Sequence, residues 1–551
     1  MSASAKKKLR KEQNAAQLTE KQLKEQKEAK KLKIYTAIFV VAIAVVLVAG
    51  IIAGGISFYN NSGIVEKNTT AAVVDDHEIS SVELSYYYKD MITSNYNTWQ
   101  SSYGESLSLF MSFMGLDLTK PLNEQQYAEN TTWADYFVQS ALEKAKSDYL
   151  LCQKAKAEGF TLPEEERLAL DNAIAQLPTF ATIYGYSSTD HYLTSLYGPG
   201  ANEDSYVQYS ENVSLANAYY NAYGKSLNID DAAIRAYEDG QYEKFSSYSY
   251  ASYRIPHSDY LTGGTTGEDG TVTYTQEEEE TARAAAKADA MKLTSATNLD
   301  ELNKAIAALP KNEGELVTAS TFTDSLYDTC STISRDWLAS SLRKVGDCAV
   351  IPSQTEVTAE DGTTTTVEND YYVVMFLGRN DNERPLANVR HILVNIEGGT
   401  TDANGVITYT DAEKAAAMAE AEAILAEFQA GDATDESFAA LATEKTDDTA
   451  SAATGGLYED ITPQQGIYEE AFTNWAVDPE RKAGDTGIIE TGHGYHVMYY
   501  VGDGDLNYRD HIISGKIRTE KVNAWYADIM ATATATAKDT SHLDLDIVLQ
   551  S

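Results

Sequence analysis

The fold of this chain is decided by VRHILV (389–394), TDDTASAATGGL (446–457) and TGHGYHVMYYVG (491–502). The first and last runs are rich in β-branched and aromatic residues and are bounded by Gly, Asn or Asp, which predicts two short strands. Between them, DAEKAAAMAEAEAILAEFQAG (411–431) carries apolar residues at helical spacing and closes on Gly, which predicts a helix. The stretch is therefore predicted to be α+β, with His391 and His496 on two strands and an acidic pair in the loop between them.

A series of short motifs runs through the same stretch in a fixed order: HIL (391–393), an Ala-rich helix, SFAALA (437–442), Asp448-x(6)-Gly-Gly-Leu, AGDTG (483–487) and GYHV (494–497). From Ala387 to Gly502 this series resembles the parvulin (PpiC-type) peptidyl-prolyl isomerase domain, which is an antiparallel sheet with helices. In that family two His residues and a Cys or Asp form a hydrogen-bonded cluster beneath the prolyl ring of the substrate. The resemblance implies that His391, Asp448 and His496 form the catalytic cluster.

The resemblance also implies a pocket for the proline ring. Its expected substrate-binding residues are Leu457, Tyr468, Phe472 and Thr491, of which Thr491 supports the histidine cluster. The chain departs from the family in two places. GGDLG is usual in the family where this chain has Gly455-Gly456-Leu457-Tyr458, and His493 stands where Ser is common.

Two questions about the site stay open from the residues alone. Asp447 is an alternative to Asp448, although the six-residue spacing to Gly455-Gly456 favours Asp448. A metal site that uses the nearby His and Asp side chains is conceivable, but no ligand spacing such as HExxH or CxxC supports one. We expect neither a metal nor a cofactor. Rotation about an X–Pro bond breaks no covalent bond, so these side chains are expected to tune the pocket's electrostatics rather than to act as nucleophiles.

The loop after the first His bears on the substrate. Parvulins directed to phosphorylated substrates place basic residues there, whereas residues 391–410 contain no Lys or Arg. Recognition of phospho-Ser/Thr-Pro is therefore not expected.

The N-terminus has the pattern of a membrane anchor. The first 33 residues carry a net charge of +7, and the next stretch, 34–58, is uncharged, apolar and long enough to span a bilayer. The basic flank predicts that residues 1–33 are cytoplasmic and that everything after Tyr59 lies outside the cell membrane. A cleaved signal peptide is the alternative, but the basic region and the apolar run are both longer than is usual.

The remaining chain is strongly acidic, since the whole sequence has a net charge of −40. This balance argues against binding to nucleic acid or to anionic membranes. The three cysteines, Cys152, Cys330 and Cys348, provide no disulfide framework, although a Cys330–Cys348 bridge is possible.

Residues 59–244 read as a mainly helical domain. A strand at 70–80 leads to Ser80-x-x-Glu83, a capping box that opens a tyrosine-rich helix, and further helical stretches follow. This layout resembles the chaperone domain of SurA/PrsA-type foldases. The chain has 37 Tyr against 13 Phe and 5 Trp, which suits an adaptable surface for unfolded segments, although simple packing between helices explains the same rings.

An internal repeat predicts a second, degenerate parvulin-like module at 245–380. GGTTGEDGTVTYT (263–275) matches GGTTDANGVITYT (398–410), and YYVVMFLG (371–378) matches YHVMYYVG (495–502). Aligning Arg254 with Arg390 places Ile255 where His391 stands, and Tyr372 takes the place of His496. The module is therefore expected to hold substrate or structure without isomerase activity, while residues 386–503 form the isomerase module.

The C-terminal segment, 504–551, is predicted to contain an amphipathic helix and a strand-like tail. By the same resemblance it is expected to return to the helical domain, with Trp525 and Ile547 packed against it. Together these features favour a single-pass, membrane-anchored, extracytoplasmic peptidyl-prolyl isomerase and chaperone for unfolded or secreted polypeptides with X–Pro bonds. The alternatives are a non-catalytic holdase or scaffold at the cell surface and, less favoured, a surface-assembly factor without folding clients.

Overall fold

The computed structural model describes residues 63–543 apart from 269, 314, 359–361, 402–406 and 465, together with Ser4 and Leu545. The predicted transmembrane helix at 34–58 and the predicted contact of Ile547 lie outside the described residues. Within the described part, no helix combines the length and the apolar character that crossing a membrane requires. The chain forms two compact units. The first comprises residues up to 228, 447–453 and 518 onward, and the second comprises 229–446 and 454–517.

The first unit is mainly helical, with one three-stranded sheet in the order β17-β1-β2. Its larger elements are β1 (Thr70–Val74), β2 (His77–Ser80), α4 (Ser81–Tyr103), α5 (Leu107–Phe113), α6 (Trp133–Ala157), α7 (Glu164–Ala175), α8 (Leu177–Ile183), α9 (Thr189–Tyr197), α10 (Glu203–Ser226) and β17 (Ala535–Ala537). The helices begin where the sequence supplies caps. Ser80 accepts a hydrogen bond from the backbone of Glu83, and Thr132 and Asp135 close a full capping box at α6.

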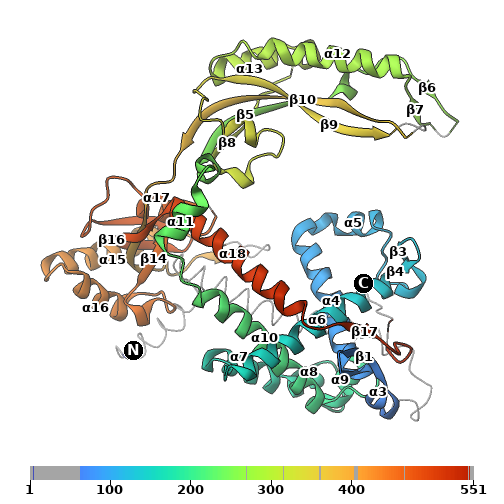
Figure 1. Ribbon diagram of the computed structural model, residues 1–551. Helices are drawn as coiled ribbons and strands as arrows, with labels where there is room; N and C mark the ends of the chain where they lie inside the picture. The colour runs from blue at the N-terminus through green and yellow to red at the C-terminus, as the bar shows by residue number, and fades with distance from the viewer. Residues whose placement is uncertain are drawn as a thin grey trace. The chain divides into compact units, whose positions relative to one another are not determined.

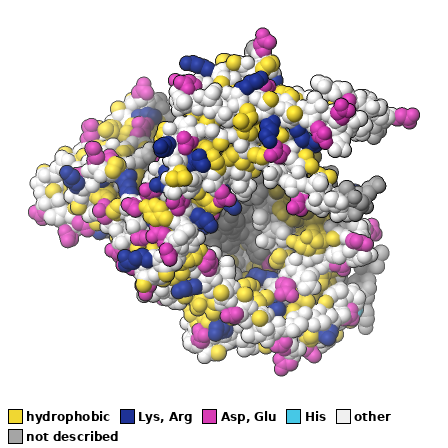
Figure 2. Space-filling model, turned by 45° about the horizontal axis from the view of Figure 1, so that its top comes forward, with side chains coloured by type: hydrophobic (Ala, Val, Ile, Leu, Met, Phe, Trp, Pro, Cys, Tyr) yellow, Lys and Arg dark blue, Asp and Glu magenta, His cyan; other side chains and the backbone are white. Residues whose placement is uncertain are grey.

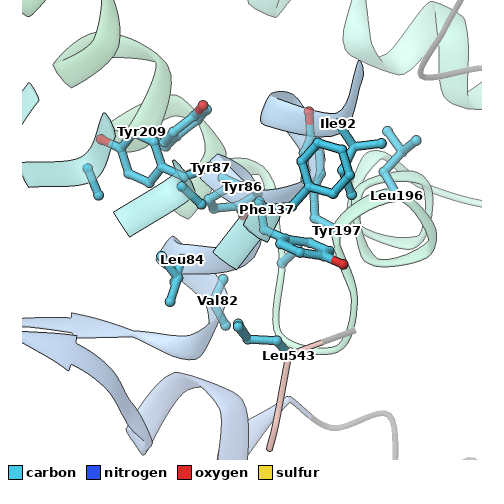
Figure 3. Packing of buried hydrophobic residues seen from close by; sticks show 14 of the residues in the cluster. Val82, Leu84, Tyr86, Tyr87, Ile92, Phe137, Leu196, Tyr197, Tyr209 and Leu543 are labelled. Atoms are coloured by element: carbon cyan, nitrogen blue, oxygen red, sulfur yellow. The ribbon is translucent and has the colours of Figure 1, made fainter. Parts of the chain in front are cut away.

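Tyrosines fill much of the core of this unit, as the packing interpretation predicts for these rings. Figure 3 shows Tyr86, Tyr87, Tyr197 and Tyr209 among aliphatic side chains such as Leu84 and Ile92. Buried hydroxyls find partners, because the hydroxyl of Tyr86 lies 2.7 Å from that of Ser205.

The C-terminal end of the chain completes the first unit. Trp525, on α18 (Tyr508–Met530), stacks on Tyr223 of α10 with ring centroids 4.0 Å apart. Farther on, β17 pairs antiparallel with β1. The three-stranded sheet and the helical core of the first unit therefore contain residues from before the second unit and from after it in the sequence.

The second unit contains two four-stranded antiparallel sheets. The first has the order β8-β5-β10-β9 and is built from β5 (Ser247–Ile255), β8 (Ser320–Leu326), β9 (Cys348–Thr358) and β10 (Thr364–Asn380). Its helices are α12 (Gln276–Leu293), α13 (Leu299–Ala307) and α14 (Arg335–Leu338), and a short helix, α11 (Asp231–Glu238), precedes the sheet. Figure 1 shows α12 along one face of this sheet, over β5 and β10. Cys330 and Cys348 are unpaired thiols, so the possible bridge between them is not formed.

The second sheet has the order β14-β11-β16-β15. It is built from β11 (Pro385–Val394), β14 (Leu457–Ile461), β15 (Thr486–Thr491) and β16 (Gly494–Asn507), with helices α15 (Asp411–Ala430), α16 (Asp435–Lys445) and α17 (Glu470–Ala476). Helices α15 and α16 cover one face of β11 and β16. Between β11 and α15, a short hairpin pairs β12 (Thr400–Thr401) with β13 (Ile407–Thr408).

The two sheets follow one plan, in agreement with the internal repeat. In each sheet, the loop before the edge strand (β9 or β15) forms backbone hydrogen bonds with a single residue of the central strand (β10 or β16). Gly346 and Asp347 bond the backbone of Phe376, as Gly484 and Asp485 bond that of Tyr500. Phe376 and Tyr500 are therefore equivalent positions.

The register corrects one detail of the sequence alignment. Phe376 pairs with Tyr250 and Tyr500 pairs with Val389. Two residues farther along β5 and β11, Ser252 pairs with Val374 as His391 pairs with Met498. Ser252, rather than the predicted Ile255, thus takes the place of His391, because the alignment through the arginines shifted the strand by three residues. Tyr372 takes the place of His496, as predicted from the sequence.

Candidate active site

Two histidines meet on one face of the second sheet. His391 pairs with Met498 across the β11–β16 ladder and His496 pairs with Leu393, so the two histidines are diagonal neighbours on the same face. Their Nδ1 atoms lie 3.1 Å apart and their rings are stacked, with centroids 5.3 Å apart. Both side chains are fully buried. The sheet therefore brings together two residues that are far apart in the sequence, as the motif positions predict.

The turn between β15 and β16 contacts the histidine pair at His496. The hydroxyl oxygen of Thr491 lies 2.7 Å from Nε2 of His496 and accepts a hydrogen bond from the backbone N–H of His493. His496 thus has a partner at each ring nitrogen, which fixes the orientation of its ring. The side chain of His493 points elsewhere, with Nε2 3.4 Å from a carboxylate oxygen of Glu469.

Burial determines the charge of His496. It lowers the pKa of His496 well below the ordinary value for histidine, and positive charge on His391 or His493 would lower it further. His496 is therefore neutral near pH 7. A neutral imidazole donates at one nitrogen and accepts at the other, so a single proton occupies the short contact between the two Nδ1 atoms.

An aromatic wall covers the pair. His391 meets the rings of Tyr458 and Phe472 edge to face, with centroids 5.1 and 5.6 Å away, and Phe472 also lies 5.8 Å from His496. Tyr468 packs on Phe472 at 5.6 Å and on Tyr458 at 6.0 Å. Phe472 is fully buried on α17. The aromatic rings therefore enclose the histidine pair and shield it from water.

Tyr458 was missed in the sequence, and Leu457 was expected in its place. In the β11–β14 ladder Tyr458 pairs with Val389, whereas Leu457 pairs with Arg390. Cross-strand pairs share a face, and Arg390 lies on the side opposite His391, where it bonds Asp435 of α16. Leu457 therefore does not wall the histidine pair. The alternation of side chains along the strand could have identified Tyr458, since a shift of one residue moves a side chain to the other face of the sheet.

Asp448 lies in the loop after α16, in segment 447–453. Its carboxylate accepts hydrogen bonds from the backbone N–H groups of Ala450 and Ser451, each at 3.2 Å, and from the hydroxyl of Ser451. Asp448 is fully buried, whereas its neighbour Asp447 is only partly so. The buried carboxylate is thus held in a fixed orientation by its own loop.

Both ends of this loop are attached to β11. The hydroxyl of Thr446 accepts from the backbone N–H of Leu393 at 3.0 Å, and the carbonyl of Gly456 accepts from that of His391 at 3.0 Å. Arg390 also donates to the carbonyls of Thr454 and Gly455. The chain on either side of Asp448 is therefore tied to the strand that carries His391.

We find no cluster of three or more His, Cys, Asp or Glu side chains placed to hold a metal ion among residues 63–543, outside the undescribed gaps. The site residues that the structure brings together are His391, His496, Thr491, Phe472 and Tyr468, with Tyr458 in addition. Together they form a buried, hydrogen-bonded histidine pair under an aromatic cover.

A four-stranded antiparallel sheet with helices on one face and a buried histidine pair under aromatic rings on the other defines a parvulin-type peptidyl-prolyl isomerase domain. Residues 391–502 match the model of the Rotamase family, the PPIC-type PPIASE domain. The match contains both histidines and the aromatic wall, and this part of the chain is an isomerase domain of that type.

Among solved structures, the chain is similar to the crystal structure, at 1.70 Å resolution, of the peptidylprolyl isomerase PrsA from Bacillus anthracis. The identity is 19%, the likeness covers 28% of this chain and 59% of that chain, and the TM-score is 0.16. No curated protein matches the sequence.

Proposed function

We propose that the chain is a membrane-anchored, extracytoplasmic peptidyl-prolyl isomerase and chaperone that assists the folding of secreted proteins. The observation that carries the catalytic part is the buried contact between His391 and His496 beneath Phe472. His391, His496 and Asp448 are the proposed catalytic residues. The attachment of both loop ends to β11 supports the inclusion of Asp448.

The proposed mechanism stabilises a twisted amide. Rotation about an X–Pro bond passes through a state without amide resonance, at a barrier of about 18–20 kcal/mol. An apolar pocket favours the twisted bond. The planar amide has more charge separation than the twisted amide, so it loses more hydration when it enters the pocket. The buried histidine pair holds the field beneath the prolyl ring constant during rotation, and the Asp448 carboxylate biases the proton between the two imidazole rings. No covalent intermediate, metal or cofactor takes part.

The anchor and the location rest on the sequence alone. The basic segment 1–33 and the apolar stretch 34–58 support a single-pass helix with its N-terminus in the cytoplasm. The acidic side chains scattered over the face drawn in Figure 2 accord with the net charge of −40, which disfavours nucleic acid as a partner. The proposed partners are unfolded or secreted polypeptides with X–Pro bonds and the membrane itself.

A holdase without catalysis is the alternative, and one observation favours it for part of the chain. The first sheet has Ser252 and Tyr372 where the second has the histidine pair. The module at 245–380 is therefore proposed to act by binding only. A surface-assembly factor without folding clients is a weaker alternative, which capture of client proteins would test.

The test is an exchange measurement on X–Pro peptides with the full chain. We expect His391→Ala and Asp448→Ala each to lower the catalysed rate by about tenfold to a hundredfold, since each removes a group that orients the field at the amide. His511→Ala is the matched control, because it alters an exposed histidine on α18. Unchanged rates in both variants, with suppression of client aggregation retained, would establish the holdase instead.

A further inference from the structure

The first unit contains a pocket that the isomerase site does not use. It has a volume of about 500 Å³ and lies among β2, α4, α6 and α10. Four tyrosine rings line it: Tyr86 and Tyr87 from α4, Tyr149 from α6 and Tyr209 from α10. Figure 3 shows three of these rings, Tyr86, Tyr87 and Tyr209, from close by. One carboxylate, that of Glu83, also lines the pocket.

Glu83 departs from the role that its sequence position predicts. In a capping box the Glu side chain bonds back to the backbone of the cap residue. Glu278 and Glu413 do so, with bonds of 2.8 and 2.7 Å to the backbone N–H groups of Thr275 and Thr410. At α4 only half of the box forms, since Ser80 accepts from the backbone of Glu83 without the return bond. The carboxylate of Glu83 is thus directed to the pocket.

The three glutamates differ electrostatically as a result. Backbone hydrogen bonds lower the pKa of Glu278 and of Glu413, whereas burial raises the pKa of Glu83 to about 7. Lys67 and Lys156 also line the pocket, but both are exposed and neither of them forms an ion pair with Glu83. The Glu83 carboxylate therefore lies in the pocket without a bonded cation from the residues that the structure describes.

The surrounding rings suit a planar cation. Tyr149 stacks on His77 with centroids 4.1 Å apart, and burial lowers the pKa of His77, which keeps this imidazole neutral. Guanidinium groups lie flat on aromatic faces and bond carboxylates through two N–H groups, so aromatic rings beside an unpaired carboxylate favour arginine over a compact ammonium. The acidic net charge of the chain also attracts cationic polypeptides.

We propose that this pocket binds the guanidinium group of an arginine side chain in an extended client polypeptide, with Glu83 as its counter-ion and the tyrosines around its stem. The inference rests on the proposed handling of client chains and gives it a defined point of contact. It does not depend on isomerisation, because the bound residue is arginine rather than proline.

The test uses the full chain and proline-free Gly/Ser peptides with a central Leu-Arg-Leu, labelled with fluorescein and followed by anisotropy. A peptide with citrulline in place of arginine has the same shape without the charge. We expect the arginine peptide to bind about tenfold more tightly or better, as a charged hydrogen-bonded pair predicts. Equal affinities for the two peptides would overturn the proposal.

Variants of the chain locate the contact. Glu83→Gln is expected to remove the preference for arginine over citrulline, and Tyr149→Leu to weaken binding of the arginine peptide about threefold. Glu78→Gln, which alters an exposed carboxylate on β2 that bonds Thr70, is the matched control and should bind as the parent does. Thermal unfolding of each variant checks the fold. A preference for arginine that survives in a folded Glu83→Gln variant would place the cation elsewhere and refute the assignment.

Catalysis is measured on the same variants. Isomerisation of X–Pro peptides is expected to be unchanged by Glu83→Gln. If the arginine preference is absent while catalysis persists, the pocket assignment fails and the proposed isomerase stands. If catalysis is absent while the arginine preference persists, the reverse holds.

Discussion

The proton between His391 and His496 is confined by burial. Thr491 occupies Nε2 of His496 and His391 occupies Nδ1, so the ring has no contact with bulk water through either nitrogen. Because burial holds the pKa of His496 well below its ordinary value, protonation of His496 in the folded state requires a pH far more acidic than 6.5. The ring stays neutral over the range in which an exposed histidine titrates.

This neutrality predicts a flat activity profile. We expect the isomerisation rate, measured by exchange spectroscopy on an X–Pro peptide, to change by less than about twofold between pH 8 and pH 6. Stability behaves differently, since unfolded His496 titrates near 6.5. A lowered folded-state pKa contributes stability that is complete above that value and is lost as the pH falls below it. A rate that falls in step with an ordinary histidine titration would contradict a role for neutral His496.

In the first unit, the pKa of Asp90 is shifted in the opposite direction, since burial raises it. Asp90 lies on α4 and accepts hydrogen bonds from the hydroxyls of Tyr197 at 3.2 Å and Tyr209 at 2.6 Å, yet burial raises its pKa to about 7. The folded state therefore binds a proton more readily than the unfolded state, so the first unit loses stability as the pH rises from the ordinary carboxyl pKa of 3.8 to about 7.

We predict that Asp90→Asn raises the melting temperature of the first unit at pH 8 and raises it less at pH 5, where folded Asp90 keeps its proton. The amide keeps one acceptor for the tyrosine hydroxyls and removes the buried charge. Asp204→Asn, at an exposed position on α10, is the control and should have no effect at either pH. Circular dichroism melts at the two pH values measure the difference. A destabilised Asp90→Asn at pH 8 would show that the charge is required.

Some residues of the site can be recognised in the sequence from motif spacing, whereas others can be recognised only once the strand register is known. The two histidines are recognisable because each sits in its own motif. Tyr458 and Ser252 depend on which face a strand presents, and the sequence offers no marker for that choice where Gly455 to Tyr458 departs from GGDLG. Glu83 was predicted as a capping-box partner, and local pattern alone does not reveal that a pocket attracts its side chain.

At the scale of elements, the loop between α16 and β14 depends on one glycine. Gly456 has φ of +69°, and a Cβ atom there would lie 2.2 Å from the carbonyl oxygen of His391. That close approach lets the Gly456 carbonyl bond the backbone N–H of His391 and ties the loop to β11. Any side chain at position 456 would push the start of β14 away from β11.

We predict that Gly456→Ala destabilises the second unit by more than about 2 kcal/mol, since it combines a left-handed backbone with a collision against main chain. Gly484→Ala is the matched control. Gly484 also has positive φ, at +93°, but a Cβ there meets nothing within 4 Å. Urea unfolding of both variants separates backbone strain from crowding. Equal destabilisation of the two would mean that the contact with His391 contributes little.

At the scale of the whole molecule, the internal repeat predicted two modules of one plan, and the two sheets have the same strand order. The repeat did not predict that order itself, because strand pairing depends on contacts between residues distant in the sequence. Trp525 stacks on Tyr223 of α10, the kind of contact with the helical domain that the resemblance led us to expect. The predicted boundaries at 59–244, 245–380 and 386–503 stay predictions.

The pairing of β17 with β1 makes the first unit sensitive to loss of its last residues. Lys538 donates to the carbonyl of Ala71, and Thr534 bonds both the backbone and the side chain of Asp75. We predict that deletion of residues 531–551 raises hydrogen-exchange rates in β1 by about tenfold or more and leaves those in β10 and β16 unchanged. Exchange measured by mass spectrometry on one sample provides both readings. Protection of β1 that persists after the deletion would show that β17 is dispensable.

This pairing also sets an order of events during synthesis. The last strand of either sheet in the second unit ends at Asn507, whereas the first unit still lacks β17 at that point. As the nascent chain leaves the ribosome, both sheets of the second unit have all their strands before the first unit has its third. The protein therefore acquires its isomerase before the helical unit that was started first can close.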